Sequence, residues 1–253
     1  MTQPVVALAV SFPNGHRIPR HRHRSAQLVL AVTGVMTVTT RDGTWVVPPL
    51  RAVFVPAGVV HAIRMTGAVA MRTVYVARPL ADALPDACCV VSVTPLLREL
   101  VVRAAGFPKR WAVDSSEARV AALIVDEIRA ARVAPLQLRS PRDARALRVT
   151  RALEANPGDA RSLAQWAKSA GASPRTLARV FQSETGLSFG AWRQQLRLLR
   201  ALERIGSGDA VTAVALELGY ESPSAFIAMF RKALGVSPGR YFRGSGPLRG
   251  VGA

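Results

Sequence analysis

Residues 162–186 read Ser162-Leu-Ala-Gln-Trp-Ala-Lys-Ser-Ala-Gly-Ala-Ser-Pro-Arg-Thr-Leu-Ala-Arg-Val-Phe-Gln-Ser-Glu-Thr-Gly186. Apolar residues return at helical spacing on both sides of Gly171, so the stretch predicts one helix over 162–170 and another over 174–185. Ser173 suits an N-cap, Pro174 suits a first helical position, and Gly186 ends the second helix. The second helix has an apolar face and a polar face, and the polar face contains Arg175, Thr176, Arg179 and Gln182.

The same arrangement recurs over residues 211–235. Val211–Leu218 predicts a short helix, Gly219–Ser222 a turn, and Ser222-Pro223 a capped start of a helix that Gly235 ends. A helix, a tight turn containing glycine and a second helix with a polar face form the helix-turn-helix arrangement that binds DNA. Between the units, Phe189–Ile205 predicts a helix about 25 Å long, which approaches the ~34 Å between successive major grooves on one DNA face.

Residues 1 to about 80 predict short β-strands. Gln27–Thr33 and Val35–Thr39 are β-rich runs separated by Gly34, and Arg41–Thr44 supplies an Asp-Gly hairpin turn. Further short runs follow at 52–55, 61–65 and 72–76. Short strands separated by turn signals favour a β-sandwich or a barrel.

All four histidines lie in this β-rich region. His21 and His23 are two residues apart, so on a strand both side chains project from one face, and Gln27 shares that face. His61 is far away in the sequence but within the same predicted domain. We expect His16, which stands apart from this pattern, to be a surface residue.

Residues 81–140 predict helices and a linker. Apolar residues recur at helical spacing in Leu96–Arg103 and in Ser115–Val133, and the second helix is apolar on a wide stripe. We expect one side of that stripe to pack on the β-domain and the other on a second subunit of a homodimer. The alternative is burial within one chain. Residues 134–141 contain two prolines and predict the linker.

The tandem layout resembles the AraC/XylS family of bacterial transcription regulators over about 100 residues. The matching positions are Leu163-Ala164, Ser173–Leu177, Phe181, Glu184–Gly186, Ala215, Gly219-Tyr220, Ser222, Phe226, Phe230–Lys232, Gly235–Pro238 and Tyr241. The resemblance implies a sequence-specific regulator that binds double-stranded promoter DNA and contacts RNA polymerase. It does not distinguish an activator from a repressor.

The family's base-contacting positions can be carried over to both units, as Arg175, Ala178 and Arg179, and then Pro223, Ser224 and Ala228. Two arginines one helical turn apart can each approach a guanine edge, whereas the second unit offers a single hydroxyl. We therefore expect the first unit to read bases and the second mainly to dock on phosphates. The docking residues are Ser222, Ser224, Arg231 and Lys232. A solvated helix end is the alternative for the last two.

Two strings in the N-terminal half resemble the motifs of the cupin superfamily, small β-barrels that often hold a divalent metal. They are Gly15-x5-His21-x-His23-x3-Gln27-x6-Gly34 and Pro56-x-Gly58-x2-His61. The resemblance implies metal or effector ligands at His21, His23, Gln27 and His61.

This chain departs from the cupin pattern. Gln27 stands where the family has Glu, which removes one negative charge, and Leu50 and Met65 also depart from the second motif. Three neutral imidazoles can still hold Zn²⁺, Ni²⁺, Co²⁺ or Fe²⁺. The alternative is a set of barrel-lining polar residues that contact an organic effector.

The charge follows the same division of the chain. The net charge is +18, with nine arginines against one acidic residue in 1–80, seven basic against seven acidic residues in 81–138, and 18 against eight in 139–253. The C-terminal excess agrees with a DNA partner. The N-terminal excess can attract an anionic effector, add non-specific DNA affinity, or reflect arginine-rich codons.

Several classes of protein are disfavoured. No uncharged apolar run approaches the ~20 residues of a membrane helix, and the N-terminus lacks the basic region of a signal peptide. The adjacent Cys88 and Cys89 make no disulfide framework, so we expect a reducing cytoplasm. No catalytic constellation is apparent, so we expect no enzyme. The alternatives are a cupin metalloenzyme fused to a DNA-binding module and an architectural DNA-binding protein.

Together these patterns predict a multidomain α+β chain. We expect a cupin-like effector- or metal-binding β-barrel over 1–80, a helical interface segment and linker over 81–140, an all-α double helix-turn-helix domain over 141–243, and a flexible tail over 244–253. In this hypothesis, a small ligand or metal alters how the barrel packs on the helices of the middle segment and so controls DNA binding.

Overall fold

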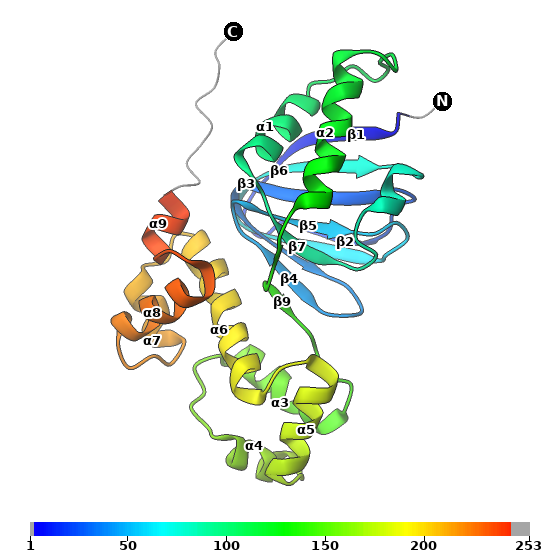
Figure 1. Ribbon diagram of the computed structural model, residues 1–253. Coiled ribbons are helices and arrows are strands. Elements are labelled where there is room, and N and C mark those ends of the chain that lie inside the picture. The colour runs from blue at the N-terminus through cyan, green and yellow to red at the C-terminus, as the bar shows by residue number, and fades with distance from the viewer. Residues whose placement is uncertain (1–2, 244–253) are drawn as a thin grey trace. The chain divides into compact units, whose positions relative to one another are not determined.

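The computed structural model of the protein describes residues 3–243 (Figure 1), and the expected tail at 244–253 lies outside them. The chain divides into two compact units. The N-terminal unit comprises the residues up to Arg41 and Trp45–Leu136, and the C-terminal unit comprises Asp42–Thr44 and the chain from Gln137 to Arg243. Residues 81–136 therefore share a unit with the strands that precede them.

The N-terminal unit is built on an antiparallel sheet. Its strands are β1 Val5–Phe12, β2 Arg17–His21, β3 Ala26–Thr39, β4 Thr44–Val47, β5 Arg51–Val55, β6 His61–Val76, β7 Cys89–Ser92 and β8 Val133–Ala134. Their order is β1-β6-β3-β5-β7-β8, with β2 also beside β6 and β4 beside β3. Within the described residues this order has two ends and does not return on itself. The β-rich fold is confirmed, but the sheet is not a closed barrel.

Two long strands form the centre of this sheet. β3 and β6 pair from Ala26↔Val76 to Thr39↔Ala62, where the sequence alone predicted shorter separate strands. The pairing register shifts around Gly34, which has a φ of +71°. A Cβ at Gly34 would lie 2.7 Å from the carbonyl oxygen of Ala68, so this irregularity requires glycine. Gly34 therefore distorts one continuous strand and does not end it.

Two helices, α1 Pro95–Ala104 and α2 Ser116–Ala130, cover one face of the sheet (Figure 1). They follow the short 3-10 helix η1 Leu80–Ala83. Alternate sheet residues such as Leu28 and Val74 share a core with Val101 and Ile124 of the helices. Both helices were predicted from the sequence. The second helix ends before the expected Val133, because the backbone adopts an extended conformation at Ala131.

The C-terminal unit begins with a two-residue strand and continues as helices. The elements are β9 Gln137–Leu138, α3 Ala144–Ala155, α4 Leu163–Ala170, α5 Pro174–Thr185, α6 Phe189–Gly206, α7 Val211–Glu217, α8 Pro223–Leu234 and α9 Pro238–Arg243. Both helix-turn-helix units are confirmed, as α4–α5 and α7–α8. α6 joins them and buries Trp192, Leu196, Leu199 and Leu202. The helices α3 and α9 were not predicted from the sequence. Neither were β9, in the expected linker, and β8, where the expected helix meets that linker.

Candidate functional site

Three of the four candidate metal or effector residues meet at one place in the N-terminal unit. His21 ends β2 and lies opposite His61, the first residue of β6, and His23 follows two residues after His21. One ring nitrogen from each of the three lies within 4.8 Å of the others. The ring centroids of His21 and His61 are 4.3 Å apart. The sheet therefore brings together side chains that are 40 residues apart in the sequence.

Main-chain carbonyl groups orient two of these rings. Nδ1 of His21 lies 2.7 Å from the carbonyl oxygen of Pro19, and Nδ1 of His61 lies 3.0 Å from that of Val59. Because a carbonyl oxygen only accepts, each Nδ1 donates, and Nε2 of the neutral ring keeps a free lone pair. Nε2 of His61 and Nε2 of His23 are buried and have no hydrogen-bond partner among the described residues.

The surroundings of His23 and His61 favour the neutral form of these two rings. Burial lowers the pKa of His23 and of His61, and the neighbouring His21 lowers both pKa values further. Neutral imidazole is the form that binds a metal ion or accepts a hydrogen bond from an effector.

The fourth candidate, Gln27, lies beside the cluster on β3. Its side-chain amide group donates to Thr73 Oγ1 at 2.9 Å and to Tyr75 Oη at 3.1 Å, and the Tyr75 ring contacts His23 at 4.9 Å between centroids. With the amide nitrogen engaged in this way, Oε1 of Gln27 is buried without a hydrogen-bond partner among the described residues. The sequence analysis missed Thr73 and Tyr75, because only the pairing of β3 with β6 brings them next to Gln27.

These donors suit a borderline divalent metal ion. Three imidazole nitrogens fit the common ligand sets of Zn²⁺, Ni²⁺, Co²⁺ and Fe²⁺, and an amide oxygen or a solvent molecule can complete them. The buried Nε2 atoms and the buried Oε1 atom are polar groups that a ligand would satisfy. The same atoms could accept hydrogen bonds from an organic effector.

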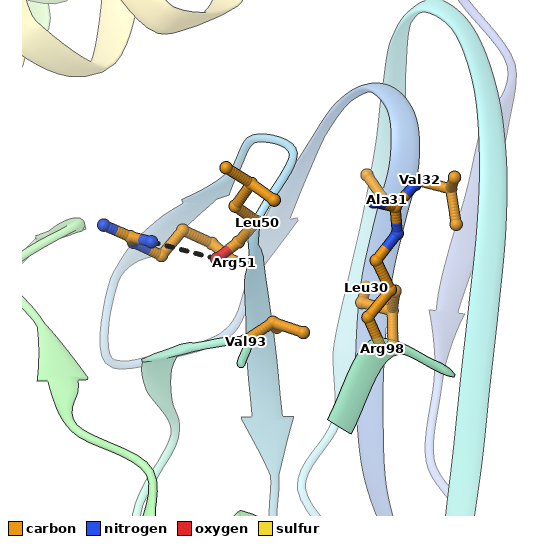
Figure 2. Close-up of a pocket in the computed structure, with 7 residues that line it drawn as sticks. All are labelled: Leu30, Ala31, Val32, Leu50, Arg51, Val93 and Arg98. Atoms are coloured by element: carbon orange, nitrogen blue, oxygen red, sulfur yellow. Dashed lines mark hydrogen bonds between the residues drawn. The ribbon is translucent and has the colours of Figure 1, made fainter. Parts of the chain in front are cut away.

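A separate pocket in the N-terminal unit is too small for an organic effector. It lies between the middle of β3, the start of β5 and α1 (Figure 2), and its volume is about 10 Å³. The lining residues are Leu30, Ala31, Val32, Leu50, Arg51, Val93 and Arg98. A volume of this size holds about one water molecule.

In the first helix-turn-helix unit, α5 presents its predicted DNA-reading face to solvent. Arg175 and Arg179 are exposed one turn apart, and neither has a hydrogen bond or an ion pair with the described residues. The Thr176 hydroxyl is already hydrogen-bonded to the Ser173 hydroxyl, at 2.9 Å. Gln182 is exposed and donates to the Gly186 carbonyl oxygen at 3.3 Å.

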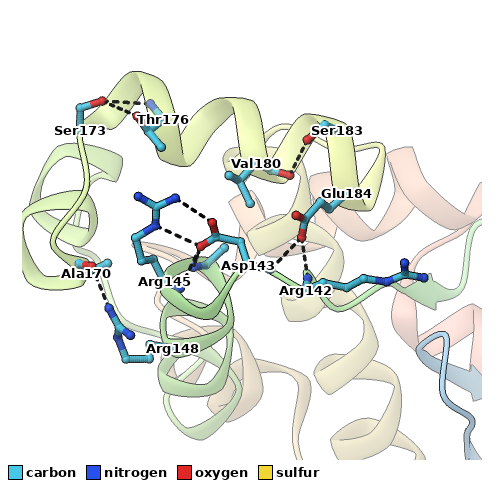
Figure 3. A network of polar contacts seen from close by, with 11 residues as sticks. Arg142, Asp143, Arg145, Arg148, Ala170, Ser173, Thr176, Val180, Ser183 and Glu184 are labelled. Atoms are coloured by element: carbon cyan, nitrogen blue, oxygen red, sulfur yellow. Dashed lines mark hydrogen bonds and ion pairs between the residues drawn. The ribbon is translucent and has the colours of Figure 1, made fainter.

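A polar network fixes α5 against its neighbours (Figure 3). Oε2 of Glu184 accepts from the main-chain N–H groups of Arg142 at 2.5 Å and Asp143 at 3.0 Å, which lie just before α3. Arg148 of α3 donates to the carbonyl oxygen of Ala170 at the end of α4, at 2.9 Å. The Arg145 guanidinium holds the pKa of the Asp143 carboxyl well below its usual range. The recognition helix is thus tied through α3, which the sequence analysis did not find.

In the second unit, the four predicted docking residues lie at opposite ends of α8. Ser222 caps the helix and accepts from the N–H of Ala225 at 3.2 Å, and Ser224 is exposed in the first turn. Arg231 and Lys232 are exposed in the last turn, about 12 Å away along the axis. The structure does not bring the four residues into one cluster.

The two helix-turn-helix units approach each other through backbone. A Cβ built on Gly158, in the α3–α4 loop, would lie 2.3 Å from the carbonyl oxygen of Glu217 at the end of α7. Arg197 of α6 donates to the carbonyl oxygen of Pro157 at 2.9 Å and stacks over Tyr220 at 5.5 Å. We call this contact between the units the glycine contact. It joins the loop before α4 to the end of α7.

The fold and these sites define a DNA-binding regulator with a ligand-binding domain. Among known families, an AraC-like ligand-binding domain matches residues 4–147 and a helix-turn-helix domain matches residues 166–244. The chain belongs to the AraC family of transcriptional regulators. It is 37% identical to the HTH-type transcriptional regulator NimR of Escherichia coli over 223 residues, 88% of this chain and 81% of that protein.

Solved structures of the same kind are also similar. ToxT of Vibrio cholerae is 9% identical, with a TM-score of 0.42 over 97% of this chain and 99% of that one. The DNA-binding domain of AdpA in complex with a target DNA is 34% identical, with a TM-score of 0.37 over 40% of this chain and 92% of that one. Within residues 3–243, no helix is long and apolar enough to cross a membrane.

Proposed function

We propose that this AraC-family regulator is controlled by a divalent transition metal ion held by His21, His23 and His61, with Gln27 or solvent completing the site. The observation that carries the proposal is the convergence of three imidazoles, of which His23 and His61 have a buried Nε2 atom without a hydrogen-bond partner among the described residues. The bound ion would act as an effector that links β2, β3 and β6.

The sheet offers a route from this site to the helices. Gln27 belongs to the site, and its neighbour Leu28, on the opposite face of β3, belongs to the core shared with α1 and α2. On β6, Thr73 likewise contacts Gln27 at the site, and its neighbour Val74, on the opposite face, belongs to the same core. A ligand that repositions Gln27 would therefore change how the sheet packs on the helices. It can bias DNA binding only by its difference in affinity for the two states.

On DNA, the proposal assigns base reading to the first unit and phosphate docking to the second. The support is the exposed, unpaired state of Arg175 and Arg179. Ser222, Ser224, Arg231 and Lys232 are the docking residues. The proposal further includes a homodimer, contact with RNA polymerase, and a cytoplasmic location, where promoter DNA is found.

The test combines metal analysis with DNA binding. Operators would first be selected from random DNA with the full-length protein. Metal content would then be measured in the wild type, in His61→Ala, and in the control His16→Ala, whose exposed ring stacks on Phe12 outside the cluster. We expect about one ion per chain in the wild type and the control and none in His61→Ala. Adding that ion should change operator affinity except in His61→Ala.

Two outcomes would redirect the proposal. If the wild type binds none of Zn²⁺, Ni²⁺, Co²⁺ and Fe²⁺, the metal is excluded and the cluster becomes a candidate site for an organic effector. The three-histidine cluster also fits a cupin metalloenzyme. We propose no catalytic role, because the similar proteins are transcriptional regulators. Substrate-dependent O₂ consumption by the metal-loaded protein would contradict that choice.

A further inference from the structure

A cleft of about 190 Å³ opens in the C-terminal unit, at the place where α3 and α7 both end. This volume has room for several water molecules, and so for a small organic molecule. α3 contributes Glu154 and Ala155 to the lining, α6 contributes Arg200 and Arg204, and α7 contributes Val214 and Glu217. The cleft thus combines apolar side chains with charged groups of both signs.

The two guanidinium groups of the cleft are already paired with carboxylates. Arg200 pairs with Glu203 at 2.9 Å, and Glu203 is buried. Arg204 pairs with both Asp209 and Glu217. Three carboxylates therefore neutralise two guanidinium groups, and the cleft offers little free positive charge to an anionic ligand.

The carboxyl group of Glu154 is different, because it has no hydrogen bond or ion pair with the described residues. Burial raises the pKa of this half-buried carboxyl, and the charges of Arg200 and Arg151, which form no ion pair with it, offset that effect only in part. The C-terminus of α3 lies at the same place and adds partial negative charge. A bound cation would supply the partner that the Glu154 carboxylate lacks.

We propose that this cleft binds a small organic cation, which consists of an ammonium group on a short apolar chain. The ammonium group donates hydrogen bonds to the Glu154 carboxylate, and the chain lies against Ala155 and Val214. The site is separate from the histidine cluster and does not depend on the metal ion of the proposed function. Because the cleft lies between α3 and α7, the bound cation contacts elements on both sides of the glycine contact.

The test titrates the full-length protein with n-pentylammonium and with two probes of similar size, neutral 1-pentanol and anionic pentanoate, at constant ionic strength. Backbone amide shifts in NMR spectra report both the affinity and the place of binding. We expect n-pentylammonium to bind with a Kd in the millimolar range and to shift the signals of residues 154–158 and 211–218. 1-Pentanol should bind about tenfold more weakly, because it lacks the charge, and pentanoate should not bind.

Two variants show whether Glu154 holds the cation. Glu154→Gln should weaken binding of n-pentylammonium about tenfold or more, and urea unfolding should show that this variant is at least as stable as the wild type. The control Glu221→Gln makes the same charge change in the exposed turn between α7 and α8 and should bind like the wild type. The inference is overturned by unchanged binding in Glu154→Gln, by equal affinities for n-pentylammonium and 1-pentanol, by shifts confined to other residues, or by no binding up to about 100 mM.

Discussion

Replacing Gly158 by alanine should separate the two helix-turn-helix units. The added Cβ would lie 2.3 Å from the Glu217 carbonyl oxygen, whereas carbon and carbonyl oxygen usually approach to about 3.3–3.6 Å. The backbones must therefore move apart by about 1 Å. Neither atom is the end of a flexible side chain, so rotamer changes cannot relieve the overlap. Overpacking of this kind costs about 1–3 kcal/mol, part of which would appear as lost stability of the C-terminal unit.

The displacement should also weaken binding to two sites on DNA. On an operator that engages both units, we expect Gly158→Ala to reduce affinity about tenfold, because about 1.4 kcal/mol is spent on restoring the spacing. On a fragment that holds only the site of the first unit, affinity should stay within twofold of the wild type. Fluorescence anisotropy at fixed salt measures both affinities, and urea unfolding measures the stability.

Gly190→Ala is the matched control. Gly190 lies in α6, and a Cβ there meets nothing within 4 Å, so alanine should stabilise the helix slightly. If Gly158→Ala unfolds at the same urea concentration as the wild type and binds the two-site operator equally well, the glycine contact does not set the spacing. Equal losses of affinity on the two-site operator and on the one-site fragment would instead mean that the substitution damages the first helix-turn-helix unit.

Three further predictions concern single side chains of the C-terminal unit. Arg179→Ala should relax the preference at one base by about 1–3 kcal/mol in binding to operator variants, whereas Lys232→Ala should weaken binding to all sequences alike and lower the salt slope by about 0.9. Identical behaviour of these two variants would refute the division of roles. Trp192→Phe removes the 2.8 Å hydrogen bond from Nε1 to the Arg139 carbonyl oxygen and should cost about 1–2 kcal/mol in urea unfolding. Burial raises the pKa of Glu154 in the folded protein. At pH values above the pKa that Glu154 has in the unfolded chain, its buried carboxylate therefore lowers the stability of the native state. Glu154→Gln should stabilise the protein at pH 7 but less at pH 4. An equal gain at both pH values would exclude that explanation.

Local signals made the DNA-binding helices predictable from the sequence. The bounds of α5 follow from Ser173, Pro174 and Gly186, which act on their own neighbours in the chain. α3 has an equally local cap in Asp143, but it follows the proline-containing linker and was missed. Spacing and resemblance indicated the histidine cluster, and the structure brings three of its four candidate residues together.

Features that depend on distant pairing could not be found in this way. Gly34 was interpreted as a break between strands, because glycine disfavours a strand locally. Pairing with β6 holds the chain extended on both sides of it. Thr73 and Tyr75 likewise adjoin Gln27 only through the antiparallel register across more than 40 residues. No short-range pattern contains that register. The glycine contact has the same origin, since Gly158 and Glu217 are more than 50 residues apart in the sequence.

The separation between the glycine contact and the exposed arginines has a consequence for how such a regulator can change over generations. Among the described residues, Arg175 and Arg179 form no hydrogen bond or ion pair. Under the proposed function, substitutions there alter the bases that are preferred without a penalty in folding. At the glycine contact, main chain meets main chain at Gly158, and a change of side chain elsewhere does not adjust that distance. We expect this contact to set the spacing of the two helix-turn-helix units. With these roles, we expect descendants of this protein to acquire new operator sequences readily, while the distance between the two halves of the operator is inherited unchanged.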